Sequence, residues 1–170
     1  MLDKKVKELI NQQVNKEFYS AYLYLDYAEY YEQLGLDGFA NWYDVQAQEE
    51  LDHGMLMRTY LQDNGEKVIL EAIAKPDQTF DTILDQLKAG LAHEQYVTSL
   101  VHEIYHAAFD VRDYRTMQFL DWFVKEQGEE EKNAEDLIKK YELFGSDAKG
   151  LYELNQELLS REYSAPSLTL

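Results

Sequence analysis

Residues 39–60, FANWYDVQAQEELDHGMLMRTY, form a helical apolar stripe that is interrupted by polar residues at its centre. Positions spaced alternately three and four apart face the same side of a helix in a bundle. On this stripe they are Phe39, Tyr43, Gln46, Glu50, His53, Met57 and Tyr60. The ends of the stripe are aromatic or apolar, whereas its middle would bury an acid and a histidine.

Three further segments repeat this pattern. Each has apolar or aromatic residues at the ends of its stripe and a glutamate near the middle. The series are Val6, Ile10, Gln13, Glu17, Ser20 and Tyr24; Leu87, Leu91, Glu94, Thr98, Val101, Tyr105 and Ala108; and Leu120, Phe123, Gln127, Glu130, Ala134, Leu137 and Tyr141. The sequence therefore predicts four long helices with one buried glutamate on each.

The breaks between these segments predict how the helices connect. We expect helices over about 3–34, 39–64, 80–109 and from the break at 110–113 to 144, then a short fifth helix over 148–161. Turns at 35–38 and 110–113 are short enough for antiparallel hairpins. The segment 66–79 is long for a helix–helix loop and can cross the bundle. The predicted fold class is all-α: a four-helix bundle with one long crossover between helices 2 and 3.

The domain prediction is one domain over 1–162 and a C-terminal tail over 163–170. The fifth predicted helix carries Leu151, Leu154 and Leu158 on one side. We interpret this helix as a contact for assembly with other copies of the chain.

Composition excludes several classes of protein. With 170 residues, 45% of them apolar, the chain is long enough for a sizeable core. It has no cysteine, which excludes disulfides, thiolate catalysis and iron–sulfur clusters. The formal charge of −17 repels nucleic acid and anionic lipid, so we expect neither as a partner. No export signal or membrane span is recognisable, and the expected location is cytoplasmic.

Four acids inside one bundle need compensating charge. Burying an unpaired carboxylate costs several kcal/mol, and none of the four stripes contains a lysine or arginine. A pair of divalent cations would neutralise the acids, and carboxylates with an imidazole suit iron or manganese. Glu50 and His53 form Glu-x-x-His, which places both side chains on one helix face, where they can share a metal ion.

With these residues identified, the chain resembles the bacterial non-haem ferritins along nearly its whole length, which implies a ferritin-like fold. The resemblance is carried by Glu17, the run Glu50-Leu51-Asp52-His53, Glu94 and the run Gln127-Gly128-Glu129-Glu130. It implies that Glu17 and His53 bind one iron, that Glu50 bridges two, and that Glu94 and Glu130 bind the second. Gln127 would form hydrogen bonds beside the pair.

The same resemblance implies further site residues. Bacterial members bind a third iron close to the pair, and the matching residues are Glu49, Glu126, Glu129 and the shared Glu130. Tyr24 matches the family's tyrosine beside the di-iron centre. Haem is not expected, because Leu51 stands where the similar bacterioferritins place their haem-binding methionine.

The activity implied by the resemblance is that of a ferroxidase. Fe²⁺ and O₂ would be the substrates, and the ferric product would grow as an oxyhydroxide mineral inside a homo-oligomeric shell, which the family builds from 24 subunits. The implied function is iron storage and detoxification. Within the di-iron class an oxygenase is the alternative, and the matched third-site acids favour storage.

Two alternatives come from other classes of protein. The run His102-Glu103-Ile104-Tyr105-His106 matches the H-E-x-x-H signature of zinc proteases, although no glycine or third histidine follows at the metzincin spacing. Weak surface binding of zinc is the milder interpretation of this histidine pair. A helical assembly protein that binds metal only for structure is the other alternative. His93 belongs to no motif, and we expect it on the surface.

Overall fold

The computed structural model describes residues 2–168, and the predicted boundaries at residues 1 and 170 lie outside them. Five helices are present: α1 (Lys4–Leu34), α2 (Asp37–Asp63), α3 (Ile83–Asp110), α4 (Tyr114–Phe144) and the short α5 (Ala148–Leu158). No strand occurs over residues 2–168. The all-α prediction of four long helices and a short fifth one is confirmed.

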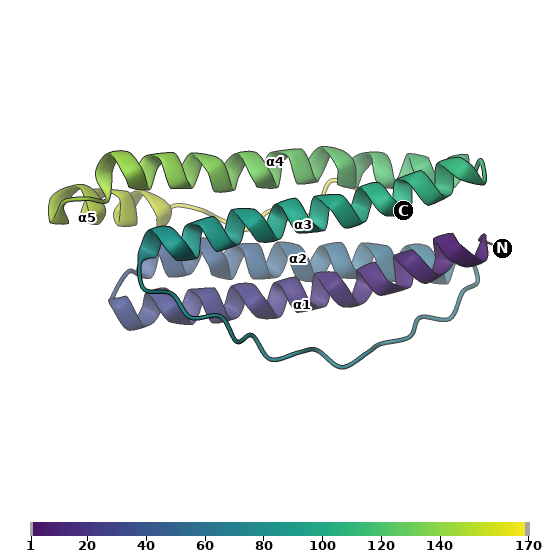
Figure 1. The fold of residues 1–170 in the computed structure, drawn as a ribbon, viewed down its shortest axis with the longest axis horizontal. Helices are drawn as coiled ribbons and strands as arrows, with labels where there is room; N and C mark the ends of the chain where they lie inside the picture. Colours follow the sequence, from purple (N-terminus) through teal and green to yellow (C-terminus); the bar gives the residue numbers. More distant parts are fainter. Residues whose placement is uncertain (1, 169–170) are drawn as a thin grey trace.

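The connections produce the predicted topology (Figure 1). Gly35, at a φ of 70°, ends α1 and allows an immediate turn into α2. Arg112, at a φ of 58°, makes the equally tight turn between α3 and α4. Between these hairpins the chain crosses the length of the bundle, so that α2 and α3 run parallel.

The crossover is held against α1 by two asparagines one helical turn apart. The Asn11 side chain accepts from the amide of Ile69 at 2.8 Å, and its Nδ2 donates back to the Ile69 carbonyl at 3.1 Å. Asn15 accepts in the same way from the amide of Glu71 at 2.7 Å. These bonds give partners to backbone groups that no helix or strand satisfies.

Two helix boundaries differ from the prediction. Helix α3 begins at Ile83 rather than near residue 80, because the Thr82 side chain accepts from the amide of Asp85 and caps the helix there. Helix α5 ends at Leu158 rather than at 161. The chain then turns along α2, which carries Arg161 into the bundle.

The core is divided into two apolar clusters. One holds Val6, Ile10 and Val14 of α1 with partners from the other long helices, and the second holds Leu23, Tyr24 and Tyr27 of α1 with theirs. In α1 the buried residues between these clusters include Glu17. The polar interruption predicted in each stripe is thus a real layer across the bundle.

Helix α5 closes one end of the bundle instead of facing outward. Leu154 and Leu158 are 3% and 4% exposed and belong to the second cluster, and Leu151 packs against it. The Asn155 side chain accepts from the amide of Gly38 at 2.8 Å, at the start of α2. Leu154 and Leu158 are covered by their own chain, so the leucine side is not an assembly contact, and a role of the rest of the helix in assembly stays a prediction.

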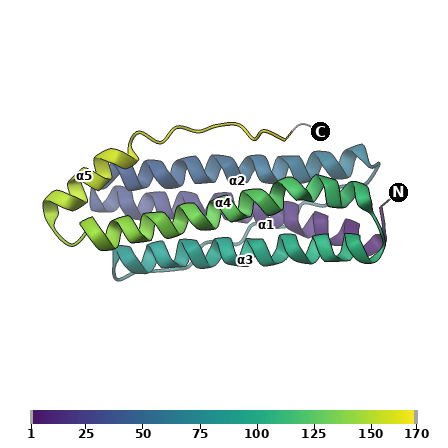
Figure 2. The same cartoon turned by 90° about the horizontal axis from the view of Figure 1, so that it is seen from above.

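Residues 159–168, here called the C-terminal strap, run back along α2 (Figure 2). The Tyr163 hydroxyl donates to Asp52 of α2, and Trp122 of α4 donates to Ser167 at 3.1 Å. The proposed division of the chain at residue 162 stays a prediction. No described helix has the length and apolarity needed to cross a membrane.

Candidate metal centre

Each of the four long helices brings one glutamate to the polar layer. Glu17, Glu50, Glu94 and Glu130 are at most 4% exposed, and His53 beside them is 2% exposed. Ligand atoms of Glu17, Glu50 and His53 lie within 4.8 Å of one another. Those of His53, Glu126 and Glu130 form a second such group. The residues predicted from the four stripes therefore meet in space.

Neutral amides hold two of these acids in place. Gln13 of α1 donates to Glu17 Oε1 at 2.8 Å, and Gln46 of α2 donates to Glu130 Oε2 at 2.9 Å. Neither amide brings positive charge, so each fixes a carboxylate without neutralising it. The sequence placed Gln13 and Gln46 on the stripes but gave them no role at the site.

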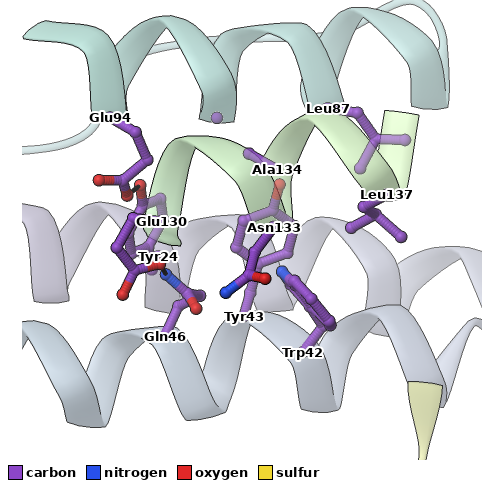
Figure 3. Close-up of a pocket in the computed structure, with 11 residues that line it drawn as sticks. Tyr24, Trp42, Tyr43, Gln46, Leu87, Glu94, Glu130, Asn133, Ala134 and Leu137 are labelled. Atoms are coloured by element: carbon purple, nitrogen blue, oxygen red, sulfur yellow. Dashed lines mark hydrogen bonds between the residues drawn. The ribbon is translucent and has the colours of Figure 1, made fainter. Parts of the chain in front are cut away.

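Glu94 has two donors of its own. Gln127 donates to Glu94 Oε2 at 3.2 Å, and the Tyr24 hydroxyl donates to Oε1. Figure 3 shows Glu94 and Glu130 beside Tyr24 and Gln46, at one end of a pocket that Trp42 and other residues of α2, α3 and α4 also line. Tyr24 therefore lies beside the buried acids, as the sequence predicted.

Four buried polar atoms of the cluster have no hydrogen-bond partner among residues 2–168. They are Glu17 Oε2, both carboxylate oxygens of Glu50, and His53 Nδ1. Buried polar atoms are almost always paired, because leaving one unpaired costs free energy. His53 Nδ1 lies 3.6 Å from Glu50 Oε2. Anionic oxygens and an imidazole nitrogen turned toward one space fit divalent iron or manganese.

Burial and mutual repulsion raise the pKa values of these acids. Burial, with the charge of Glu50 beside it, raises the pKa of Glu17 well above its usual range. The pKa of Glu50 is likewise raised by burial and then by Glu94 and Glu130. Burial, with Glu130, raises the pKa of Glu94 to about 8. Cation binding must therefore displace protons from this cluster near neutral pH.

The acids expected around a third iron are only partly gathered. Glu126 is half-buried and approaches His53 and Glu130. Glu49 forms an ion pair with Arg161 at 2.7 Å. Glu129 is exposed and lies 3.3 Å from Lys125 on the surface of α4. Its part in a third site stays a prediction.

Sequence reasoning missed the environment of two residues. Arg161, from the strap, reaches Glu49, and no helical spacing could indicate this because the residue follows α5. His93 is not the surface residue expected: it is half-buried, and its Nε2 lies 2.8 Å from the Ser20 hydroxyl. Burial lowers the pKa of His93 to about 4, so the imidazole is neutral at physiological pH. The sequence held one indication of this contact: Ser20 is a polar residue on a buried stripe and therefore needs a partner inside the bundle.

The H-E-x-x-H run does not form a catalytic zinc site. His102, Glu103 and His106 are all exposed on α3. No third ligand joins the two histidines among residues 2–168, where the groups of three ligands involve other residues. The described part of the chain also lacks the strand edge along which a protease would bind its substrate. Surface binding of zinc by the pair stays a prediction.

The structure is a bundle of long helices with one long crossover and a buried cluster of carboxylates and a histidine. These features are typical of the helical carboxylate proteins that bind two metal ions. The chain belongs to the ferritin family, since residues 7–144 match the family's ferritin-like domain. The prediction of this family from the residues alone is confirmed.

The similar proteins cover nearly the whole chain. A bacterial non-haem ferritin of Staphylococcus epidermidis is 38% identical over 164 residues, which span 96% of this chain and 99% of the relative. The corresponding protein of Campylobacter jejuni is 36% identical over 92% of this chain and 93% of its own length. Among solved structures, an engineered closed form of Archaeoglobus fulgidus ferritin is 41% identical, with a TM-score of 0.93 over 96% of this chain and all of the other.

Proposed function

We propose that the chain is a ferroxidase subunit that oxidises Fe²⁺ with O₂ at the buried cluster and delivers ferric iron for storage. Iron storage is the function of the ferritin family, to which the chain belongs. The observation that supports the oxidation step is the set of unpartnered buried atoms on Glu17, Glu50 and His53. A packed core does not leave three such groups facing one another without a cation to bind.

The proposed role of each residue follows from its place. Glu17 and His53 bind one Fe²⁺, Glu50 lies between both irons, and Glu94 and Glu130 bind the other. The acids lose protons as iron binds, because burial holds their pKa values high in its absence. Their negative charge then stabilises Fe³⁺ over Fe²⁺, which favours loss of one electron from each iron to a shared O₂.

The hydrogen-bonded neighbours fix the geometry of this site. Gln46 and Gln127 orient Glu130 and Glu94 without adding charge. Tyr24 donates to Glu94, one of the proposed ligands of the second iron. We propose Glu126 and Glu49 as ligands of a third iron nearby, together with Glu130 and, after a change in its side-chain position, Glu129.

Storage requires a multi-subunit shell, and we propose that of 24 copies. An exposed apolar patch on α1, α2 and the crossover supports a subunit contact. Tyr22, Leu25, Leu51 and Ile73 are each 47–50% exposed and line one depression. Clustered apolar residues on a surface mark interaction sites. The cytoplasmic location predicted from the sequence stays a prediction.

The test is aerobic oxidation of Fe²⁺, followed by oxygen uptake and by ferric absorbance. The variant Glu50→Ala with His53→Ala removes two of the proposed ligands. The matched control is Glu103→Ala with His106→Ala, which deletes the same residue types at the same helical spacing on the exposed face of α3.

The native chain and the control are expected to oxidise iron rapidly and to retain it as a soluble particle. The Glu50/His53 variant is expected to fall to the rate of free iron in buffer. Equal rates for all three proteins would contradict the proposed site. Loss of oxidation in the control alone would place the activity at the α3 surface instead.

A further inference from the structure

The C-terminal strap places a guanidinium among the acids proposed for the third iron. Arg161 Nη2 lies 2.7 Å from Glu49 Oε2 and also donates to Gln46 Oε1. Its Nη1 donates to the Trp42 carbonyl at 3.1 Å, and the guanidinium lies 4.1 Å from the centre of the Trp42 ring. The group therefore has four separate contacts with α2, and it is only 17% exposed.

The backbone around Arg161 is fixed independently of its side chain. Asn41 donates to the carbonyls of Leu158 and Arg161 at 3.1 Å and 3.0 Å. The Tyr163 hydroxyl, two residues further on, donates to Asp52. The strap is thus attached to α2 on both sides of Arg161, and the guanidinium is held where it meets Glu49.

A positive charge beside Glu49 stabilises it, because this carboxylate is partly buried near two others. Glu49 is 19% exposed and stands near Glu126 and Glu130, two further carboxylates. Burial raises the pKa of Glu49 to about 7 even though Arg161 opposes the shift. A partly buried acid beside two others is costly unless a positive charge stands close to it. Arg161 supplies that charge from within the chain.

We propose that Arg161 is a built-in competitor for the third iron: the metal binds Glu49 only when the strap withdraws the guanidinium. This inference rests on the proposed function and concerns the control of one of its sites. Two cations about 4 Å apart repel each other strongly in a partly buried site. Because the Arg161–Glu49 pair uses a carboxylate that the metal needs, the two occupants exclude one another.

Gln46 links this exchange to the di-iron pair. Its Oε1 accepts from Arg161 while its Nε2 donates to Glu130, the acid shared by the two sites. Withdrawal of Arg161 frees one end of Gln46 and so alters the hydrogen bond to Glu130. The strap therefore biases both the third site and a ligand of the second iron.

The first test is Mn²⁺ binding in crystals over a concentration series, with occupancies from anomalous scattering. Mn²⁺ stands in for Fe²⁺ without being oxidised. Arg161→Gln removes the charge, and Arg161→Lys keeps it. Arg115→Gln, on an exposed arginine in the first turn of α4 that pairs with Asn64, is the matched control for loss of one positive charge.

In Arg161→Gln the third position is expected to fill at roughly tenfold lower Mn²⁺ than in the native protein, since a repelling charge is gone. The position bound by Glu17 and His53 should fill as before in this variant, because Arg161 contacts neither of these ligands. Arg161→Lys and Arg115→Gln should behave like the native protein at all positions. Unchanged or weaker filling of the third position in Arg161→Gln would overturn the inference. Empty di-iron positions in every protein would instead overturn the proposed function, and this inference with it.

A second test uses the unmodified chain and needs no variant to fold. If metal and Arg161 exclude one another, metal must loosen the strap, because linkage between two binding events is reciprocal. Filling the third position with Mn²⁺ should therefore speed amide hydrogen exchange over residues 159–168. Exchange that is unchanged or slower would show that Arg161 and the metal bind together, which contradicts the proposal.

Discussion

Replacing Glu50 with glutamine should stabilise the metal-free protein while it abolishes iron oxidation. Both carboxylate oxygens of Glu50 are buried without partners, beside Glu94 and Glu130. In the absence of metal, burial and the two neighbouring carboxylates raise the pKa of Glu50 well above its usual 4.5, so the ionised acid destabilises the folded chain. Glutamine has nearly the same shape and carries no charge to neutralise.

The size of the effect follows from the pKa difference. Burial and the neighbouring carboxylates raise the pKa of Glu50 well above 4.5, and each pH unit between 4.5 and the folded pKa costs the metal-free protein about 1.4 kcal/mol. Because the folded pKa of Glu50 is raised, its side chain contributes fully to the stability of the folded protein below pH 4.5. This contribution is lost as the pH rises toward the folded pKa. For a chain of this size, about 1.4 kcal/mol corresponds to a melting-temperature difference of roughly 3–6 °C.

The assay is scanning calorimetry of chelator-treated protein at pH 5.5, 6.5 and 7.5. Glu50→Gln should melt higher than the native chain, and the difference should widen as pH rises. Glu103→Gln makes the same chemical change at an exposed position of α3 and should shift the melting temperature little. With saturating Mn²⁺ the order of native and Glu50→Gln proteins should reverse, because the native chain binds the metal more tightly.

A lower melting temperature for metal-free Glu50→Gln at pH 7.5 would refute this reasoning. It would mean that the protein itself satisfies the Glu50 carboxylate. The unpartnered atoms could then no longer be interpreted as ligands waiting for a cation.

Three further predictions concern proton release, helix capping and assembly. Mn²⁺ binding near pH 7 should release protons, since Glu94 has a pKa of about 8 without metal. Calorimetry in buffers of different ionisation enthalpy would detect this release, and its absence would contradict the raised pKa values. Asn155→Ala should lower the stability by roughly 1–2 kcal/mol, as it removes the acceptor for two amides at the start of α2, and Asn155→Asp should keep most of it in melting experiments. Leu51→Glu should shift the assembly to smaller species in size-exclusion chromatography, whereas Tyr152→Glu, at an exposed aromatic position on α5, should not.

Periodicity was sufficient to predict most of the site. The spacing of three and four residues defines which side chains share a helix face, and one glutamate per helix at matching heights indicated a common layer. Glu17, Glu50, His53, Glu94 and Glu130 are brought together as the pattern predicted. The long crossover followed from loop length alone.

The rest depended on contacts that periodicity does not encode. Arg161 reaches Glu49 because the chain turns after α5, and the residue follows the last helical turn. The leucines of α5 looked free for assembly because sequence alone does not show that this helix folds back on its own bundle. His93 of α3 contacts Ser20 of α1, and the place of Ser20 on a buried stripe was the only indication of this, because His93 lies on none of the predicted stripes.

The most direct test of the account is a crystal structure of the protein loaded anaerobically with Fe²⁺, with iron located by anomalous scattering. The account predicts two iron peaks inside the bundle, one contacted by Glu17 and His53 and the other by Glu94 and Glu130, with Glu50 between them. Iron found only on the surface, with these five side chains still unoccupied, would contradict it.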